Sequence, residues 1–168
     1  MRRRAAQMAR RILTEELAHG PGAMDYQFVG RLERAFRRAG AEDLLILLSN
    51  GQTPPAPARG VLLQQGFSVT AAMEYRGHWV KLSRPCTSPQ TTDSLQKRWE
   101  GLLCDFQRPV ELPVYAENLS GPCPYEFCDR FQLRRGDLFA FHVEFRAGGQ
   151  RLFYGDTCRF GETGADLL

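Results

Sequence analysis

The chain has 168 residues, of which 43% are hydrophobic and 24% are charged, and these proportions exclude a disordered or fibrous protein. Its net charge of +3 does not favour nucleic acid as a partner, and no stretch reaches the roughly 20 apolar residues that a membrane-spanning helix needs. The cysteines number five, an odd count, and no apolar signal region precedes them. We therefore expect one globular domain in the cytoplasm, with no membrane and no nucleic-acid partner.

Two helices are predicted at the start of the chain. Apolar residues recur at helical spacing from Ala5 to Leu17, and the pattern stops at the Gly-Pro-Gly sequence of residues 20–22. We interpret the arginines crowded into this segment as the solvated face of a helix rather than as a transit peptide. Asp25 is a favourable N-cap for a second helix, and Gly40 ends that helix.

The rest of the chain reads as strands, loops and one further helix. The apolar run 44–48 predicts a buried strand, and the glycines and prolines of 50–60 exclude helix and central strand there. In chain order, the later elements we predict are strands at 68–75 and 78–82 joined at Arg76-Gly77, a helix at 92–106, an extended segment at 110–117, and a hairpin of 138–145 and 151–157.

An internal repeat with an offset of 70 residues relates the two halves of the chain. Leu63-Gln64-Gln65-Gly66 matches Leu133-Arg134-Arg135-Gly136, and Glu74-Tyr75-Arg76 matches Glu144-Phe145-Arg146 in the same register. We therefore expect a pseudo-twofold sheet with a site in the cleft between its halves. The single domain and the two copies within it are assigned to these residues: 1–168, 51–84 and 121–159.

These segments resemble the pita-bread fold of methionine aminopeptidase, aminopeptidase P, prolidase and creatinase. Residues 8–43 are similar to the opening two helices of that domain, 63–84 to its first strand hairpin, and 133–157 to its C-terminal hairpin. The resemblance extends over nearly the whole chain. It implies an α+β fold in which helices cover a curved antiparallel sheet built from two duplicated halves.

The resemblance does not extend to the metal ligands of these peptidases, which hold two metal ions with two Asp, one His and two Glu. The matching positions hold other residues: Ala72, Lys81, His142 and Gly155 for the Asp and Glu ligands, and Leu119-Ser120 for the His ligand. A pair of divalent cations needs several carboxylate oxygens, and a lysine ammonium repels it. We therefore expect no metal and no other cofactor.

His142 and Glu144 form the candidate acid–base pair. Side chains alternate along a strand, so these two residues lie on the same face of the C-terminal hairpin. A carboxylate that orients a histidine fixes its tautomer and raises its basicity. The structural alternative is a half-buried His142 with Glu144 in a salt bridge to Arg146 or Arg76.

Glu74 and His78 complete the candidate catalytic residues. Glu74 has the place in the first repeat that Glu144 has in the second, and we expect these carboxylates to face each other across the pseudo-twofold axis. Two adjacent carboxylates share a proton, which raises the pKa of one of them. His78 follows the first hairpin turn, where an exposed turn residue is favoured over a catalytic one.

Three functions remain open. The first is a metal-independent enzyme acting on a small molecule or short peptide in a bacterial biosynthetic pathway. Creatinase cleaves a carbon–nitrogen bond on this fold without metal, and by that resemblance His142 moves the proton while Glu74 or Glu144 binds a cationic or amide substrate. The second is a pseudoenzyme that binds a peptide or protein partner, and the third is a metallopeptidase whose ligands are misaligned here. We favour the first because a pure binding module has no evident use for the His142 imidazole.

Two further expectations concern the source and the assembly of the chain. All but two of the 22 basic residues are arginine, which is typical of a GC-rich bacterial genome. The region between Arg84 and Gly121 is shorter than in the peptidases, which leaves part of the sheet uncovered. Because exposed apolar surface tends to be buried by association, we expect a homodimer.

Overall fold

The computed structural model describes residues 1–106, 111–119, 126–127, 133–162 and 164–168 of the chain. Its helices are α1 (Arg2–Leu17), α2 (Asp25–Arg38) and α3 (Pro89–Cys104). Its strands are β1 (Asp43–Ser49), β2 (Phe67–Tyr75), β3 (His78–Cys86), β4 (Val114–Asn118), β5 (Glu126–Phe127), β6 (Leu138–Ala147), β7 (Gln150–Phe160) and β8 (Ala165–Leu167). No described helix is long and apolar enough to cross a membrane.

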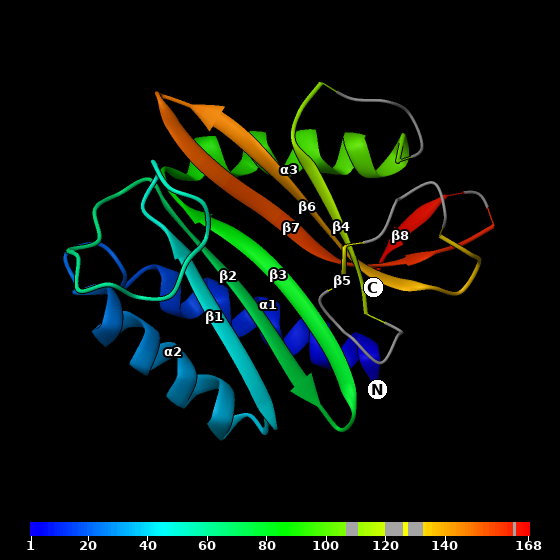
Figure 1. The fold of residues 1–168 in the computed structure, drawn as a ribbon, viewed down its shortest axis with the longest axis horizontal. Coiled ribbons are helices and arrows are strands. Elements are labelled where there is room, and N and C mark those ends of the chain that lie inside the picture. The colour runs from blue at the N-terminus through cyan, green and yellow to red at the C-terminus, as the bar shows by residue number, and fades with distance from the viewer. Residues whose placement is uncertain (107–110, 120–125, 128–132, 163) are drawn as a thin grey trace.

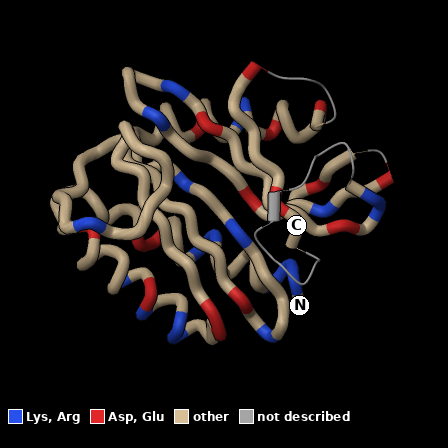
Figure 2. Tube along the Cα trace, in the orientation of Figure 1, with Lys and Arg blue, Asp and Glu red and all other residues tan. Residues whose placement is uncertain are grey.

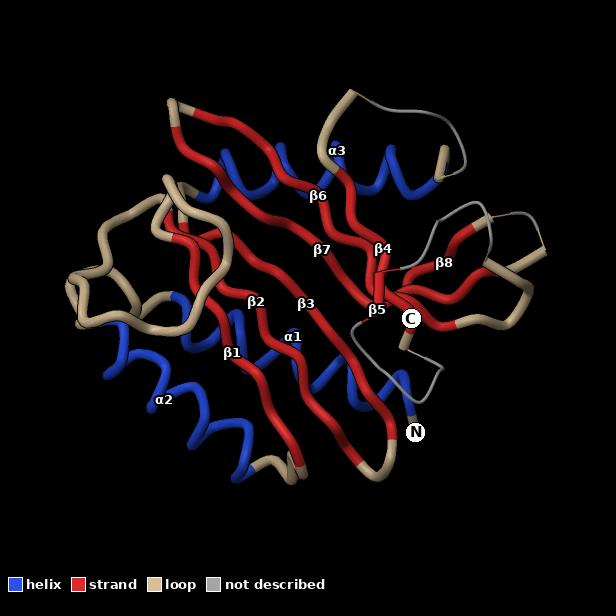
Figure 3. The backbone as a smooth tube through the Cα atoms, viewed as in Figure 1, coloured by secondary structure: helices blue, strands red, loops and turns tan. Residues whose placement is uncertain are grey.

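All of these strands belong to one sheet (Figures 1 and 3). The strand order is β1-β2-β3-β7-β6-β4-β5, and β8 pairs with β7 outside this path. The hairpin β2-β3 and the hairpin β6-β7 meet in the middle, where β3 and β7 pair antiparallel at Ser83 and Gly155. The predicted α+β fold with an antiparallel sheet is confirmed.

The helices pack against the sheet through two apolar clusters, and Figure 1 shows α1 and α3 behind the strands. One cluster joins α1 and α2 to β1, β2 and β3, and it includes Leu13, Phe28, Leu32, Val69, Met73 and Leu82. The other joins α3 to β6 and β7, and it includes Leu95, Trp99, Phe141, Phe145 and Tyr154. Because side chains alternate along a strand, the residues between these face the opposite side of the sheet.

Asp25 differs from its predicted role. The helix α2 begins at Asp25 itself, so the predicted N-cap is wrong. Its carboxylate accepts hydrogen bonds from the backbone N–H groups of Tyr26, Arg59 and Gly60 at 2.6, 2.7 and 2.9 Å. Burial opposes the ionisation of Asp25, but these donors outweigh it and lower its pKa. The residue therefore fastens the loop between β1 and β2 to the start of α2.

The strand β1 lies at the edge of the sheet, so the buried strand predicted from its apolar run is wrong. Leu44, Ile46 and Leu48 face the helices, whereas Leu45 is exposed. The following loop returns along the outer edge, where Leu48 and Ala56 exchange two backbone hydrogen bonds of 2.8 Å. Of the strands that the structure describes, β2 alone pairs with β1, and most apolar residues of β1 are only half-buried.

The turn glycines of the repeat share one backbone conformation. Gly66 has a φ of 89° and precedes β2, and Gly136 has a φ of 91° and precedes β6. Such positive angles favour glycine, which explains why both copies keep it. Residues 121–125, where the second copy starts, lie outside the described residues, and the duplication stays a prediction.

Candidate functional site

A row of paired residues crosses the centre of the sheet on the face away from the helices. Each member is the register partner of the next, from β1 to β4: Leu47, Thr70, Ser83, Gly155, His142 and Tyr115. All of them except Gly155 line a cavity of about 310 Å³, together with Pro54 and Pro55 from the loop between β1 and β2. Both hairpins therefore form the floor of the cavity.

His142 lies in this row and is 4% exposed. Its Nδ1 is 2.8 Å from Ser83 Oγ, which in turn is 2.6 Å from Thr70 Oγ1. These hydrogen bonds link β6 across β7 to β3 and β2. Among the predicted catalytic residues, His142 is the one that lines the cavity.

Gly155 makes room for this histidine. A Cβ atom at Gly155 would lie 2.4 Å from His142 Nδ1 and 2.6 Å from the carbonyl oxygen of Phe141. The Cγ–Nδ1 edge of the imidazole therefore rests on the backbone of β7. Nε2 is buried and has no hydrogen-bond partner among the described residues. Glycine at 155 thus lets the imidazole lie against β7, where Nδ1 reaches Ser83.

The surroundings of His142 keep its imidazole neutral. Burial, and after it the positive charges of Lys81 and Arg84, lower its pKa well below the ordinary value of 6.5. A neutral imidazole has one N–H donor and one acceptor nitrogen. If Nδ1 accepts a hydrogen bond, Nε2 is the donor, and if Nδ1 donates, Nε2 is the acceptor.

The pH dependence of stability tests this environment. Below a pH of about 6.5 the unfolded chain takes up a proton at His142, whereas the folded chain does so only at a much lower pH. The free energy of unfolding therefore falls with decreasing pH, by up to about 1.4 kcal/mol per pH unit from this residue. We expect a shallower decline for His142→Gln between pH of about 6.5 and 5 in urea unfolding. Equal slopes for the wild type and His142→Gln would contradict the assignment.

Lys81 and Glu117 form a buried ion pair at the cavity. Lys81 Nζ is 2.5 Å from both carboxylate oxygens of Glu117, and the two side chains are 10% and 8% exposed. The backbone of Lys81 is held by Thr157, whose Oγ1 accepts from Lys81 N at 2.8 Å and donates to Lys81 O at 3.0 Å. The pair therefore has a fixed place in the cavity wall.

Glu144 binds Arg151 and not His142, so the predicted acid–base pair is wrong. Arg151 Nε and Nη2 donate to its two oxygens at 2.8 and 2.7 Å. These hydrogen bonds lower the pKa of Glu144 against the opposing effect of burial, and the predicted sharing of a proton is wrong as well. Side chains two residues apart stand about 7 Å apart along a strand, which separates Glu144 from the ring of His142. Glu144 does form a salt bridge to an arginine, as predicted, but the partner is Arg151 and not Arg146 or Arg76.

Glu74 and Glu144 lie at opposite ends of the sheet, so their predicted meeting is wrong. Glu74 is four residues from Thr70 toward the β2-β3 turn, and Glu144 is two residues from His142 toward the β6-β7 turn. These turns point in opposite directions (Figure 1), which separates the two carboxylates by about 20 Å along the strands. His78 pairs with Tyr75 at the same turn as Glu74 and is half-buried there. The catalytic roles of Glu74, Glu144 and His78 stay predictions.

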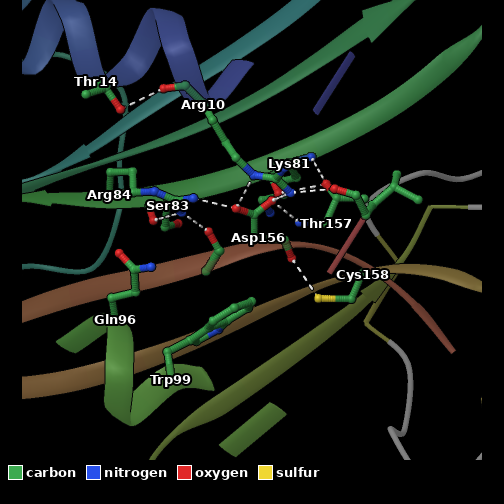
Figure 4. Close-up of polar contacts among 12 residues, drawn as sticks. Arg10, Thr14, Lys81, Ser83, Arg84, Gln96, Trp99, Asp156, Thr157 and Cys158 are labelled. Atoms are coloured by element: carbon green, nitrogen blue, oxygen red, sulfur yellow. Dashed lines mark hydrogen bonds and ion pairs between the residues drawn. The ribbon is translucent and has the colours of Figure 1, made fainter. Parts of the chain in front are cut away.

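A charged cluster that sequence reasoning missed lies beneath the cavity floor. Arg10 of α1 donates to both oxygens of Asp156 on β7, at 2.8 and 2.9 Å, and Arg84 of β3 binds the same carboxylate (Figure 4). Arg84 also donates to the carbonyl oxygens of Ser83 and Gly155. Because Arg10 and Asp156 are 146 residues apart, no local spacing signals the contact.

The donor set at the cavity does not fit the pair of metal ions implied by the resemblance. Among the described residues, Glu117 is the one carboxylate that lines the cavity, and the ammonium of Lys81 already binds both of its oxygens. Within the described residues, no group of three or more His, Cys, Asp or Glu side chains is placed to hold a metal ion. Two divalent cations need more oxygen ligands than this wall supplies, and Lys81 would repel them.

Comparisons with known proteins establish the fold. No protein-family model matches the chain, and no curated protein matches it. Three solved structures are similar, each with a TM-score of 0.62: a protein described as an aminopeptidase P from Bacillus anthracis, a methionine aminopeptidase from Thermotoga maritima, and a dipeptidase from Pyrococcus horikoshii. Their identities are 11%, 12% and 13%, and they cover 96%, 97% and 99% of this chain.

The lengths of these proteins differ from that of the chain. The chain spans 51% of the aminopeptidase P, 92% of the methionine aminopeptidase and 58% of the dipeptidase. Similarity at such low identity concerns the backbone and not the chemistry of the site. The chain has the pita-bread fold.

Proposed function

We propose that this chain is a metal-independent enzyme that binds a small molecule or short peptide in the central cavity and uses His142 to move a proton. The observation that carries this proposal is the hydrogen bond of 2.8 Å between His142 Nδ1 and Ser83 Oγ, with Nε2 of the same ring buried and unpaired among the described residues. His142 lines the cavity, and an imidazole held at one nitrogen can exchange a proton at the other.

The hydroxyl groups beside His142 support this role. Ser83 and Thr70 can each donate and accept, so their hydrogen bonds can reverse direction and match either tautomer of the imidazole. In the reaction we propose, hydrolysis of a carbon–nitrogen bond, water supplies a hydroxyl to the carbon and a proton to the leaving nitrogen. His142 relays that proton through Nε2.

A second candidate function is a binding protein without turnover. Glu117, which lines the cavity, is bound to Lys81, and Glu144 of β6 is bound to Arg151. Neither is placed as a general base beside His142, and this favours binding of a peptide or protein partner as the alternative.

The test is turnover by the purified chain in the presence of EDTA. A panel of dipeptides, N-acyl amines and guanidino carboxylates is incubated with the protein, and released amine is measured. We expect hydrolysis of at least one compound, and a loss of about 10²–10⁴-fold in kcat/KM for His142→Gln. His19→Gln, which changes an exposed histidine at the end of α1, retains the wild-type rate.

Two results would overturn the proposal. Turnover that stops with EDTA and returns with manganese, cobalt or zinc would make the chain a metallopeptidase. Binding of panel compounds without release of amine would leave the alternative, a binding protein.

A further inference from the structure

We infer that the molecule accepted by this cavity is a small carboxylate with an apolar body, bound with its negative charge beside His142. The inference rests on the proposed use of the cavity, but it concerns binding and does not require turnover. It reverses the cationic substrate expected from the sequence, because Glu144 and Glu117 are already bound to Arg151 and Lys81.

Charge around the cavity favours an anion. Lys81 and Arg151 line it and are each balanced by one carboxylate, whereas the single carboxylate of Asp156, under the floor, is shared by Arg10 and Arg84. This group of side chains therefore carries one more positive than negative charge. Figure 2 shows basic positions along β3, in the middle of the sheet.

Two of these positive charges act on His142. After burial, the charges that lower the pKa of His142 are those of Lys81 and Arg84. A negative group beside the ring is stabilised by this positive potential, whereas an ammonium group is repelled.

The hydrogen bonds of His142 allow its Nε2 to donate to an acceptor on a bound molecule. When Thr70 donates to Ser83 and Ser83 donates to Nδ1, the proton of the neutral ring is on Nε2. Nε2 is buried, and it has no hydrogen-bond partner among the residues that the structure describes. A carboxylate oxygen at this point would satisfy a buried donor, which otherwise costs about 1–3 kcal/mol.

The walls of the cavity fit an apolar body. Leu47, Pro54, Pro55 and Phe153 line it together with the ring of Tyr115. Its volume of about 310 Å³ is at the lower end of the range of roughly 300–1,000 Å³ for small-molecule pockets. The walls therefore favour a short aliphatic or aromatic acid over a long peptide.

Three probes with one apolar body test the inference: 4-methylpentanoate, 4-methylpentanamide and 4-methylpentylamine. Their binding to the full chain is measured by calorimetry at neutral pH. We expect the carboxylate to bind at least about tenfold more tightly than the amide, the amine to show no binding, and His142→Gln to weaken the carboxylate about tenfold. His19→Gln leaves all three affinities unchanged.

A nitrogen NMR spectrum of the histidine side chains gives a second measurement. The chain has only 3 histidines, so the signals of His142 are assigned by their loss in His142→Gln. We expect 4-methylpentanoate to shift Nε2 of His142 in the wild type. If His142→Gln does not fold, Ser83→Ala replaces it and is expected to reduce the preference for carboxylate over amide.

The outcomes separate this inference from the proposed function. Equal or tighter binding of the amide or the amine, or no binding of any probe, overturns the inference. Binding of the carboxylate without turnover of any panel compound supports the inference and counts against the proposed enzyme. Turnover of a cationic substrate supports the enzyme and counts against the inference.

Discussion

Replacing Lys81 with methionine is expected to lower the free energy of unfolding by about 3–5 kcal/mol, the cost of leaving a buried charge without its partner. Both oxygens of Glu117 are 2.5 Å from Lys81 Nζ, and neither side chain is more than 10% exposed. Methionine keeps the unbranched shape of the side chain but removes the charge, so Glu117 is left as an unpaired anion. Equilibrium urea unfolding at neutral pH measures the change.

Two further variants separate charge from packing. Lys97 is the other lysine of the chain and is exposed on α3, so Lys97→Met changes stability by no more than about 0.5 kcal/mol. The double variant Lys81→Met/Glu117→Leu recovers most of the loss, because no charge then remains buried. Wild-type stability of Lys81→Met alone would contradict the buried ion pair.

Elements that depend on local signals could be predicted from the sequence. The apolar spacing of residues 5–17 predicts α1, and the turn glycines at 77 and 148–149 mark both hairpins. The burial of β1 could not be predicted, because a run of leucines is the same for a central strand and for an edge strand covered on one face. The burial of β1 depends on how many strands pair with it, and this number is a property of the whole sheet.

The candidate site could be predicted only in part, for a similar reason. Alternation along β6 is a local property, and it places His142 on the cavity face. Its partner Ser83 is 59 residues away on β3, and the contact exists because β3 and β7 pair at Gly155. A long-range register of this kind has no signature in a single sequence.

The repeat predicts which residues are equivalent and not which are close. A pseudo-twofold axis of the predicted kind would bring together only residues near the place where the hairpins meet, which is at Ser83 and Gly155. Equivalent residues far from the axis are placed at opposite ends, which is where Glu74 and Glu144 lie. Equivalent positions in a repeat therefore do not imply contact between the two carboxylates.

The cluster around Asp156 is expected to be as important for stability as the pair in the cavity. Asp156→Ala removes the partner of two guanidinium groups, and we expect the free energy of unfolding to fall by about 3–5 kcal/mol. The side chain of Asp156 is 2% exposed, and those of Arg10 and Arg84 are 23% and 13% exposed, so solvent screens the lost contacts little. Urea unfolding measures the loss, and amide hydrogen exchange of α1 reports whether Arg10 still holds that helix.

Glu162→Ala is the matched control, because it removes a carboxylate from an exposed pair with Arg135, whose side chains are 65% and 73% exposed respectively. An exposed pair contributes about 1 kcal/mol or less, so this variant stays close to the wild type. Equal losses of stability in the two variants would show that the buried position of Asp156 adds nothing, and the two arginines would then be held by other contacts.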